Sequence, residues 1–174
     1  MCDETFDSCG DPAAELKQAV YSQRDAIFRG GEFQAQYDVA PVLAGLWGVE
    51  TQFDLVRATF ADGTNVPRIP PMRLGGGIFY RDANWLARVN LLHAFPQNDI
   101  GAFETPTDGY NLLKAEISYT YRNPNAAPGH PREYTVGVVG NNLLNEDIRA
   151  STSYTKDEVL MPGASVRLFA NMKF

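Results

Sequence analysis

The sequence contains few of the residues on which several classes of protein depend. Its 174 residues include two Cys and two His. Two Cys are too few for a disulfide-rich scaffold or a four-ligand zinc site. No apolar run approaches the ~20 residues of a transmembrane helix, which excludes helical membrane spans. The net charge of −6 argues against a nucleic-acid-binding protein, because such proteins present a basic surface.

Motifs of enzymes and of secretion are also missing. The sequence has no G-x-S-x-G, no P-loop and no H-E-x-x-H, so we predict neither an enzyme nor a cofactor. Gly75–Gly77 lies inside a predicted strand, whereas a phosphate-binding loop needs a helix after it. The first ten residues have no basic region followed by an apolar one, so no signal peptide is expected in this sequence.

The sequence does contain a strong period-2 alternation of apolar and polar residues. With 44% hydrophobic and 11% aromatic residues, the chain is too apolar to be disordered. Helical spacing competes with the alternation only at Ala13–Ser22, which is ambiguous. The alternation predicts seven strands at residues 20–39, 43–58, 71–82, 84–94, 110–122, 133–142 and 163–174.

The predicted connections alternate between short and long. The short ones are 40–41, 81–84 and the Pro/Gly/Asn-rich stretch 123–131, and the long ones are 59–70, 95–109 and 143–163. An antiparallel up-and-down meander with turns at one end and loops at the other produces this order. Transmembrane β-barrels have such an asymmetry.

The alternation alone fits two architectures. In a soluble β-sandwich the apolar face packs on a second sheet. In a membrane barrel the apolar face contacts lipid and the polar face lines the lumen. Aromatic residues near predicted strand ends favour the barrel, because such residues form belts at the membrane interfaces. They are Tyr37, Trp47, Tyr80, Trp85, Tyr110, Tyr119 and Tyr121.

Four stretches occur in an order that is typical of one protein family. They are YSQRDAIFRGGEFQAQYD (Tyr21–Asp38), NVPRIPPMRLGGGIFYR (Asn65–Arg81), ETPTDGYNLLKAEISYTY (Glu104–Tyr121) and GNNLLNEDIRASTSYTKDEVLMPGASVRLFANMKF (Gly140–Phe174). In this order they resemble the late barrel strands and loops of the TonB-dependent outer-membrane receptors. The similarity is greatest to the branch that takes up zinc or haem.

The resemblance implies an all-β fold, the C-terminal portion of a transmembrane barrel of about 22 strands. Residues 1–174 would then be a partial barrel, with 1–19 the remnant of an extracellular loop and with neither plug domain nor signal peptide. The implied function is TonB-energised uptake of a metal or metal complex, by a fragment that is inactive alone. Its partners would be outer-membrane lipid, the barrel assembly machinery and a small metal complex, and not nucleic acid. The TonB complex would be reached only through the missing plug.

The resemblance also implies location in the outer membrane of a Gram-negative cell. The alternative from a different class is a soluble β-sandwich binding module. It predicts a monomer in buffer that needs no detergent.

Candidate ligand-binding residues lie at the predicted extracellular rim. His93 ends a predicted strand, and Asp99 and Glu104 follow in the next loop. Cys2 and Cys9 flank three acidic residues and are compatible with a metal-binding loop, although a disulfide is favoured because C-x6-C is not a zinc signature.

The last predicted strand carries a candidate assembly signal. Leu168, Met172 and Phe174 occupy alternate positions, and Phe174 is aromatic and last. In the family that the sequence resembles, such an ending is recognised by the barrel assembly machinery. Without that role, Phe174 is a strand residue that happens to be aromatic.

Overall fold

The computed structural model describes residues 23–125, 127, 130 and 132–174. These residues form seven strands and no helix, so no helix among them is long and apolar enough to cross a membrane. The ambiguous segment Ala13–Ser22 and both cysteines lie outside the described residues. The strands are β1 (Ala26–Val42), β2 (Gly45–Phe60), β3 (Arg73–Arg81), β4 (Trp85–Ala94), β5 (Tyr110–Arg122), β6 (Glu133–Asn141) and β7 (Ser165–Lys173).

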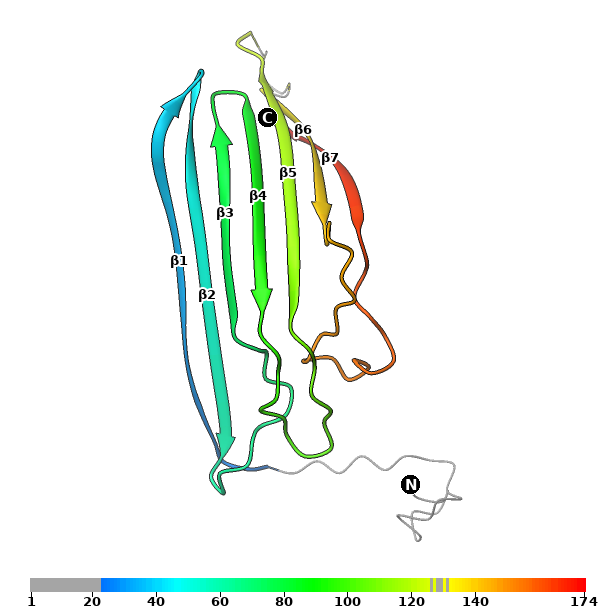
Figure 1. Cartoon of the computed structure of the whole chain (residues 1–174). Helices are drawn as coiled ribbons and strands as arrows, with labels where there is room; N and C mark the ends of the chain where they lie inside the picture. Colours follow the sequence, from blue (N-terminus) through cyan, green and yellow to red (C-terminus); the bar gives the residue numbers. More distant parts are fainter. Residues whose placement is uncertain (1–22, 126, 128–129, 131) are drawn as a thin grey trace.

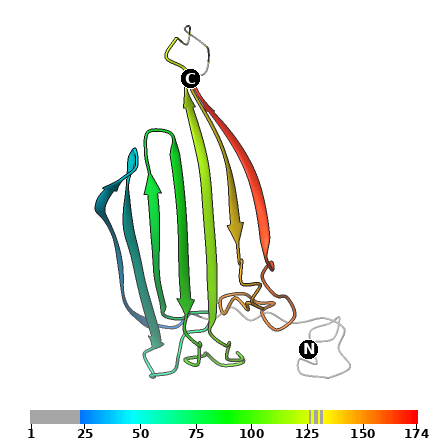
Figure 2. The same ribbon diagram turned by 45° about the horizontal axis from the view of Figure 1, so that its top comes forward.

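All seven strands belong to one sheet, in the order in which they occur along the chain. Every neighbouring pair is antiparallel. The strands lie side by side in one curved layer, with three short connections at one end and three long loops at the other (Figures 1 and 2). The predicted antiparallel up-and-down meander of seven strands is therefore confirmed.

The first predicted turn is wrong. Strand β1 continues through Ala40 and Pro41 to Val42, and the chain reverses at residues 43–44. Proline has no N–H to donate, and it is tolerated in a sheet mainly on edge strands. In the described sheet β1 pairs only with β2, so Pro41 lies on an edge strand. The register of this pair also shifts between Asp38 and Ala40, just before the proline.

The pairing register divides the side chains into two faces of opposite character. One face, here called the apolar face, carries a continuous band of aliphatic and aromatic side chains. Its members are Phe33, Tyr37, Trp47, Val49, Phe53, Leu55, Leu74, Ile78, Tyr80, Trp85, Val89, Leu91, Leu113, Ile117, Tyr119, Tyr121, Tyr134, Val136, Val138, Val166, Leu168 and Met172.

The opposite face, here called the polar face, carries most of the charged and amide groups of the strands. Its polar members are Glu32, Gln34, Gln36, Asp38, Glu50, Gln52, Asp54, Arg73, Arg81, Arg88, Asn90, Lys114, Glu116, Ser118, Thr120, Glu133, Thr135, Arg167 and Asn171. The predicted alternation thus holds through every strand pair.

Burial of the two faces is the reverse of that in a water-soluble sheet. Apolar-face side chains are open: Leu168 is 77% exposed, Tyr37 69% and Ile78 59%. On the polar face, by contrast, Ser118 is buried and the Glu50 side chain is only 17% exposed. Among the described strands, no second layer covers the apolar band, and that band is therefore not a core.

Glycines in β3 let the side chains of neighbouring strands meet across the polar face. A Cβ at Gly75 would lie 2.8 Å from the Gln52 side chain, and one at Gly77 would lie 3.0 Å from Glu50 Oε1. Gly76 points to the apolar face, where a Cβ would come no closer than 3.7 Å to another atom. The side chains of Gln52 and Glu50 in β2 thus occupy the space that side chains at Gly75 and Gly77 would otherwise fill.

We expect Gly77→Val to lower the free energy of unfolding by about 1–3 kcal/mol, the usual cost of overpacking. Its Cβ would lie 2.5 Å from the backbone oxygen of Val89, which cannot move without disturbing the ladder. Urea titration of the full chain in detergent micelles, followed by tryptophan fluorescence, measures the change.

Gly76→Val is the matched control, because it adds the same side chain to the open face of the same strand. Valine favours strands, so this variant should be neutral or slightly stabilising. Equal losses in the two variants would contradict the assigned faces.

Candidate functional site: the hollow of the polar face and the loop end

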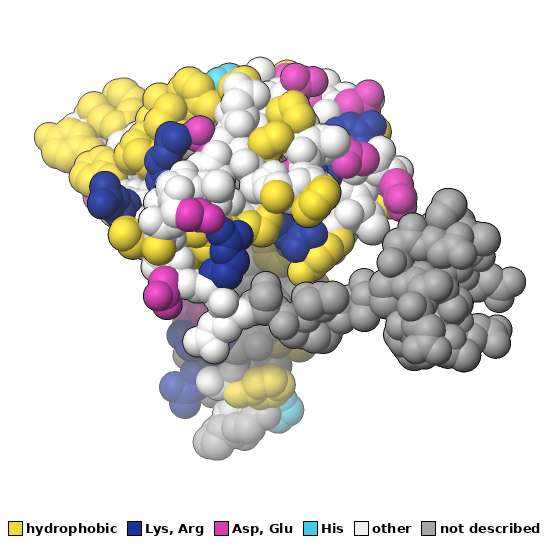
Figure 3. Space-filling model, turned by 90° about the horizontal axis from the view of Figure 1, so that it is seen from below, with side chains coloured by type: hydrophobic (Ala, Val, Ile, Leu, Met, Phe, Trp, Pro, Cys, Tyr) yellow, Lys and Arg dark blue, Asp and Glu magenta, His cyan; other side chains and the backbone are white. Residues whose placement is uncertain are grey.

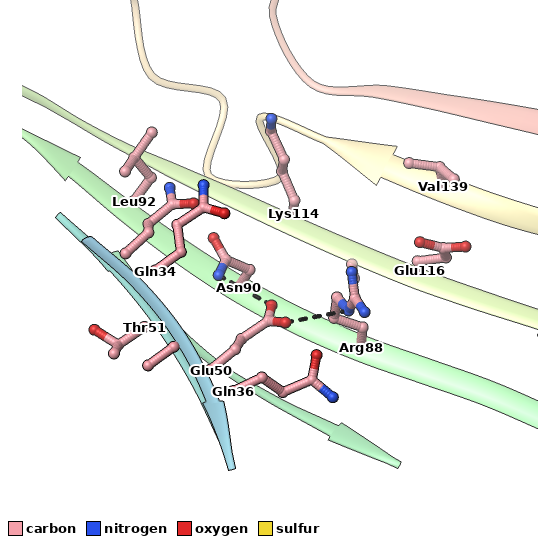
Figure 4. A pocket seen from close by; sticks show the side chains of 13 residues that line it. Gln34, Gln36, Glu50, Thr51, Arg88, Asn90, Leu92, Lys114, Glu116 and Val139 are labelled. Carbon is pink, nitrogen blue, oxygen red and sulfur yellow. Dashed lines mark hydrogen bonds and ion pairs between the residues drawn. The ribbon is translucent and has the colours of Figure 1, made fainter. Parts of the chain in front are cut away.

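A hollow of about 590 Å³ lies on the polar face, walled by side chains from β1, β2, β4, β5 and β6. Gln34 and Gln36 of β1 share it with Lys114 and Glu116 of β5 (Figure 4). Side chains of strands so far apart in one sheet can border a single hollow only if the sheet curls toward them. The polar face is therefore the concave face.

Glu50 is the centre of the hydrogen bonding in this hollow. Its carboxylate accepts a hydrogen bond from Asn90 Nδ2 at 3.2 Å, and its Oε2 lies 3.4 Å from Arg88 Nε (Figure 4). Both partners come from β4, and the contacts pass over Gly77 of the intervening strand. The space left by the glycine is thus filled by a link between two strands that do not pair.

Further ion pairs on the polar face join β3 to β2 and β3 to β1. Arg73 Nε lies 2.9 Å from Asp54, and Arg81 Nη2 lies 2.7 Å from Asp38. The pairs leave the wall polar but nearly balanced in charge. Within the described residues, no group of three or more His, Cys, Asp or Glu is placed to hold a metal ion.

An aromatic belt borders the apolar face at the end with the short connections. Trp85 and Tyr119 pack with ring centroids 4.9 Å apart, and Tyr121 and Tyr134 with centroids 6.3 Å apart. The belt consists of Tyr37, Trp47, Tyr80, Trp85, Tyr119, Tyr121 and Tyr134.

Tyr110 does not join this belt, and the prediction that grouped it there is wrong. It begins β5 at the loop end and is paired with Ala94, which places it on the polar face with Arg73 and Asp54. Successive strand residues point to opposite sides of a sheet. Tyr110 therefore faces the polar side, whereas Asn111, the next residue of β5, faces the apolar side with the belt residue Tyr119.

The short β3–β4 connection is organised by one carboxylate. Asp82 accepts hydrogen bonds from the backbone N–H groups of Trp85 and Asn84, each at 2.7 Å, and from the Tyr80 hydroxyl. These bonds favour the ionised form and lower the pKa of Asp82. The turn is held closed by its own side chain.

The three long loops are tied to one another at the opposite end. The buried Lys156 ammonium donates to the backbone oxygen of Thr105 at 2.6 Å, and the Thr105 hydroxyl donates to Asp157. The Arg68 guanidinium stacks on the Tyr154 ring. Hydrophobic, basic and acidic side chains are interspersed over this end (Figure 3).

The structure places His93, Asp99 and Glu104 at this loop end, each with partners of its own. His93 Nδ1 lies 2.9 Å from Asn111 Oδ1, and Asp99 pairs with Arg57 at 2.6 Å. Glu104 accepts the backbone N–H groups of Arg68 and Gly101. Their contacts hold the loops; ligand binding by these residues stays a prediction.

Sequence reasoning missed the role of Asn111, Asn142 and Glu146, which connect the β6–β7 loop to β5. Glu146 accepts hydrogen bonds from the backbone N–H of Asn111 at 2.6 Å and from its side chain at 3.0 Å. Asn142, fully buried with φ of 50°, bonds in turn to the backbone of Glu146. The N-N-L-L-N-E run was the available signal, since asparagine tolerates the left-handed conformation.

The backbone and side-chain bonds from Asn111, with the nearby His93, lower the pKa of Glu146. A carboxyl with a lowered folded-state pKa adds stability above its unfolded pKa and loses it as the pH falls through the folded value. The contribution of Glu146 is therefore present at neutral pH and disappears in acid.

Leu168, Met172 and Phe174, the candidate assembly residues, are respectively 77%, 63% and 72% exposed. Leu168 and Met172 lie on the apolar face of β7. Cys2 and Cys9 lie outside the described residues.

No protein-family model matches the chain.

We predict that Glu146→Gln lowers the stability of the chain at pH 7 by about 1 kcal/mol. This is below the usual range for bonds to a charged group, because the side chain is partly exposed. The difference from the parent chain should shrink as the pH falls below the ordinary glutamate pKa of about 4.3, and it should vanish once the pH is below the lowered folded-state pKa of Glu146. Thermal unfolding across pH measures it.

Asp147→Asn is the matched control, since it removes the same charge from the adjacent, exposed residue. It should leave the pH profile unchanged. A Glu146→Gln variant whose deficit persists unchanged in acid would overturn the role given to the carboxylate.

Proposed function

We propose that the chain forms part of the wall of an outer-membrane β-barrel of the TonB-dependent receptor type. In this role its apolar face contacts lipid and its polar face lines the lumen. The single observation that carries the proposal is the inverted burial: a continuous apolar band is exposed, while the polar face is concave.

The lengths of the strands support a membrane position. A tilted strand needs ~9–11 residues to cross the hydrocarbon core. The shortest strands, β3, β6 and β7, have nine residues each, and β1 has 17. Every strand is therefore long enough, and the aromatic belt provides the interfacial residues that such barrels place at the edge of the apolar band.

The soluble sandwich, the alternative architecture, lacks the layer that it needs. A sandwich buries its apolar face against a second sheet about 10 Å away. The described strands all belong to a single sheet, and Leu168, Tyr37 and Ile78 remain exposed. A face of this size in water would promote aggregation.

The receptor type and the uptake of a metal or metal complex rest on the order of the four sequence stretches. The asymmetry of the connections agrees with the proposal, because long loops at one end are a general feature of outer-membrane barrels. The edges of β1 and β7 are unpaired in the described sheet and need further strands to close a barrel. A wall of this kind contributes to uptake only within the closed barrel.

A charge on the apolar face tests the membrane position. We expect Val89→Arg to destabilise the chain inserted in lipid vesicles by about 2–4 kcal/mol, because arginine near the bilayer midplane has this cost. Val89 is 44% exposed, so in a soluble sheet the same change should have little effect. Urea unfolding in vesicles supplies the measurement.

Gln36→Arg is its control, because it adds the same side chain to the wall of the concave hollow. It should change stability by less than about 0.5 kcal/mol, as surface substitutions usually do. Equal tolerance of both arginines would exclude a lipid-facing apolar side.

Assembly into the outer membrane is tested in cells. Deletion of Phe174 should shift most of the chain from the outer-membrane fraction to aggregates or degradation products, while Phe174→Tyr should retain it. Phe103→Ala is the control for loss of an exposed phenylalanine elsewhere, since Phe103 is fully exposed in a loop. Undiminished membrane recovery after deletion of Phe174 would remove the assembly role.

A further inference from the structure

Two arginines lie directly opposite each other on the apolar side of β1 and β2. Arg29 pairs in register with Arg57, and both are exposed. Like charges at directly opposed positions of a sheet destabilise the pairing. A pair of this kind is stabilised when an anion lies between the two guanidinium groups.

The pair stands at the border of the apolar band, at the end opposite the aromatic belt. The next apolar-side positions toward the belt are Gly31, opposite Leu55, and then Phe33, opposite Phe53. A Cβ at Gly31 would have no atom within 4 Å. The glycine thus leaves an open position without a side chain in the apolar band, directly beside the two arginines, here called the notch.

The local charge contrasts with that of the whole chain. Asp99 bonds to Arg57 through both carboxylate oxygens, at 2.6 and 2.8 Å, but this exposed carboxylate neutralises only one of the two guanidinium groups. The site therefore keeps a positive charge on a chain whose net charge is −6. Attraction of an anion here is local, because the protein as a whole repels anions.

We propose that Arg29 and Arg57 bind the phosphate of an anionic lipid headgroup, with an acyl chain lying along the notch at Gly31. The guanidinium fork suits phosphate oxygens, and the arginine stems can extend along the apolar face while their charged ends reach the interface. The apolar notch beside the charges distinguishes a lipid from a free phosphate ion. This inference rests on the lipid-facing role proposed above.

Vesicle flotation with the full chain tests the inference. The chain, diluted from urea, is mixed with vesicles of phosphatidylcholine alone or of phosphatidylcholine with phosphatidylglycerol. We expect tighter binding to the anionic vesicles despite the net negative charge of the protein. Arg29→Gln/Arg57→Gln should reduce that preference at least about fivefold, the contribution of one arginine near an anionic surface, and should leave binding to neutral vesicles unchanged.

The double variant Arg81→Gln/Arg167→Gln is matched in charge and changes only the polar face. It should keep the preference of the parent chain. If it loses as much as Arg29→Gln/Arg57→Gln, the effect is one of net charge and the site is rejected. Equal binding of the parent chain to both kinds of vesicle also rejects it.

Two further outcomes separate the sources of failure. Binding to neither kind of vesicle would contradict the lipid-facing role itself, whereas binding without an anionic preference would contradict only the arginine site.

Discussion

The structure depends on the fact that a single layer of strands has two faces and that here each face suits a different surrounding. One face carries aliphatic and aromatic side chains and the other carries ion pairs and amides. Because no second layer of described strands covers the apolar face, its side chains must contact something other than this sheet. The lumen and lipid roles proposed for the two faces follow from that division.

Curvature and glycine placement turn the polar face into a connected wall. The sheet curls so that side chains of β1 and β5 border one hollow. Gly75 and Gly77 remove two side chains from the middle of that wall, and Glu50 reaches Arg88 and Asn90 over the gap. Several charged groups on this face therefore form ion pairs with each other, which lowers the cost of holding them in a shared concave surface.

The two ends of the sheet are built differently. The short connections are closed locally, as by Asp82 within its own turn. The long loops are closed by bonds between loops, including those of Lys156 with Thr105 and of Glu146 with Asn111. Bonds within this end also occupy residues that were predicted to bind a ligand. Glu104, for example, accepts hydrogen bonds from the backbone N–H groups of Arg68 and Gly101.

The strand count, the antiparallel order and the membership of the two faces were predictable from the sequence, because the period of two assigns each side chain to a face without any long-range information. The two errors have different causes. Pro41 was assigned to a turn although an edge strand accommodates it, and Tyr110 was grouped with the belt although the alternation within its own strand places it on the other face.

By itself, the sequence determined the alternation, the positions of most connections and the residues at the strand ends. Only the tertiary structure decided that the polar face is concave, that all seven strands share one sheet and that loops far apart in the chain bond to one another. It alone placed Arg29 opposite Arg57. The physical reason is that alternation is a local property of each strand, whereas curvature, register and loop contacts arise between segments that are distant in the sequence.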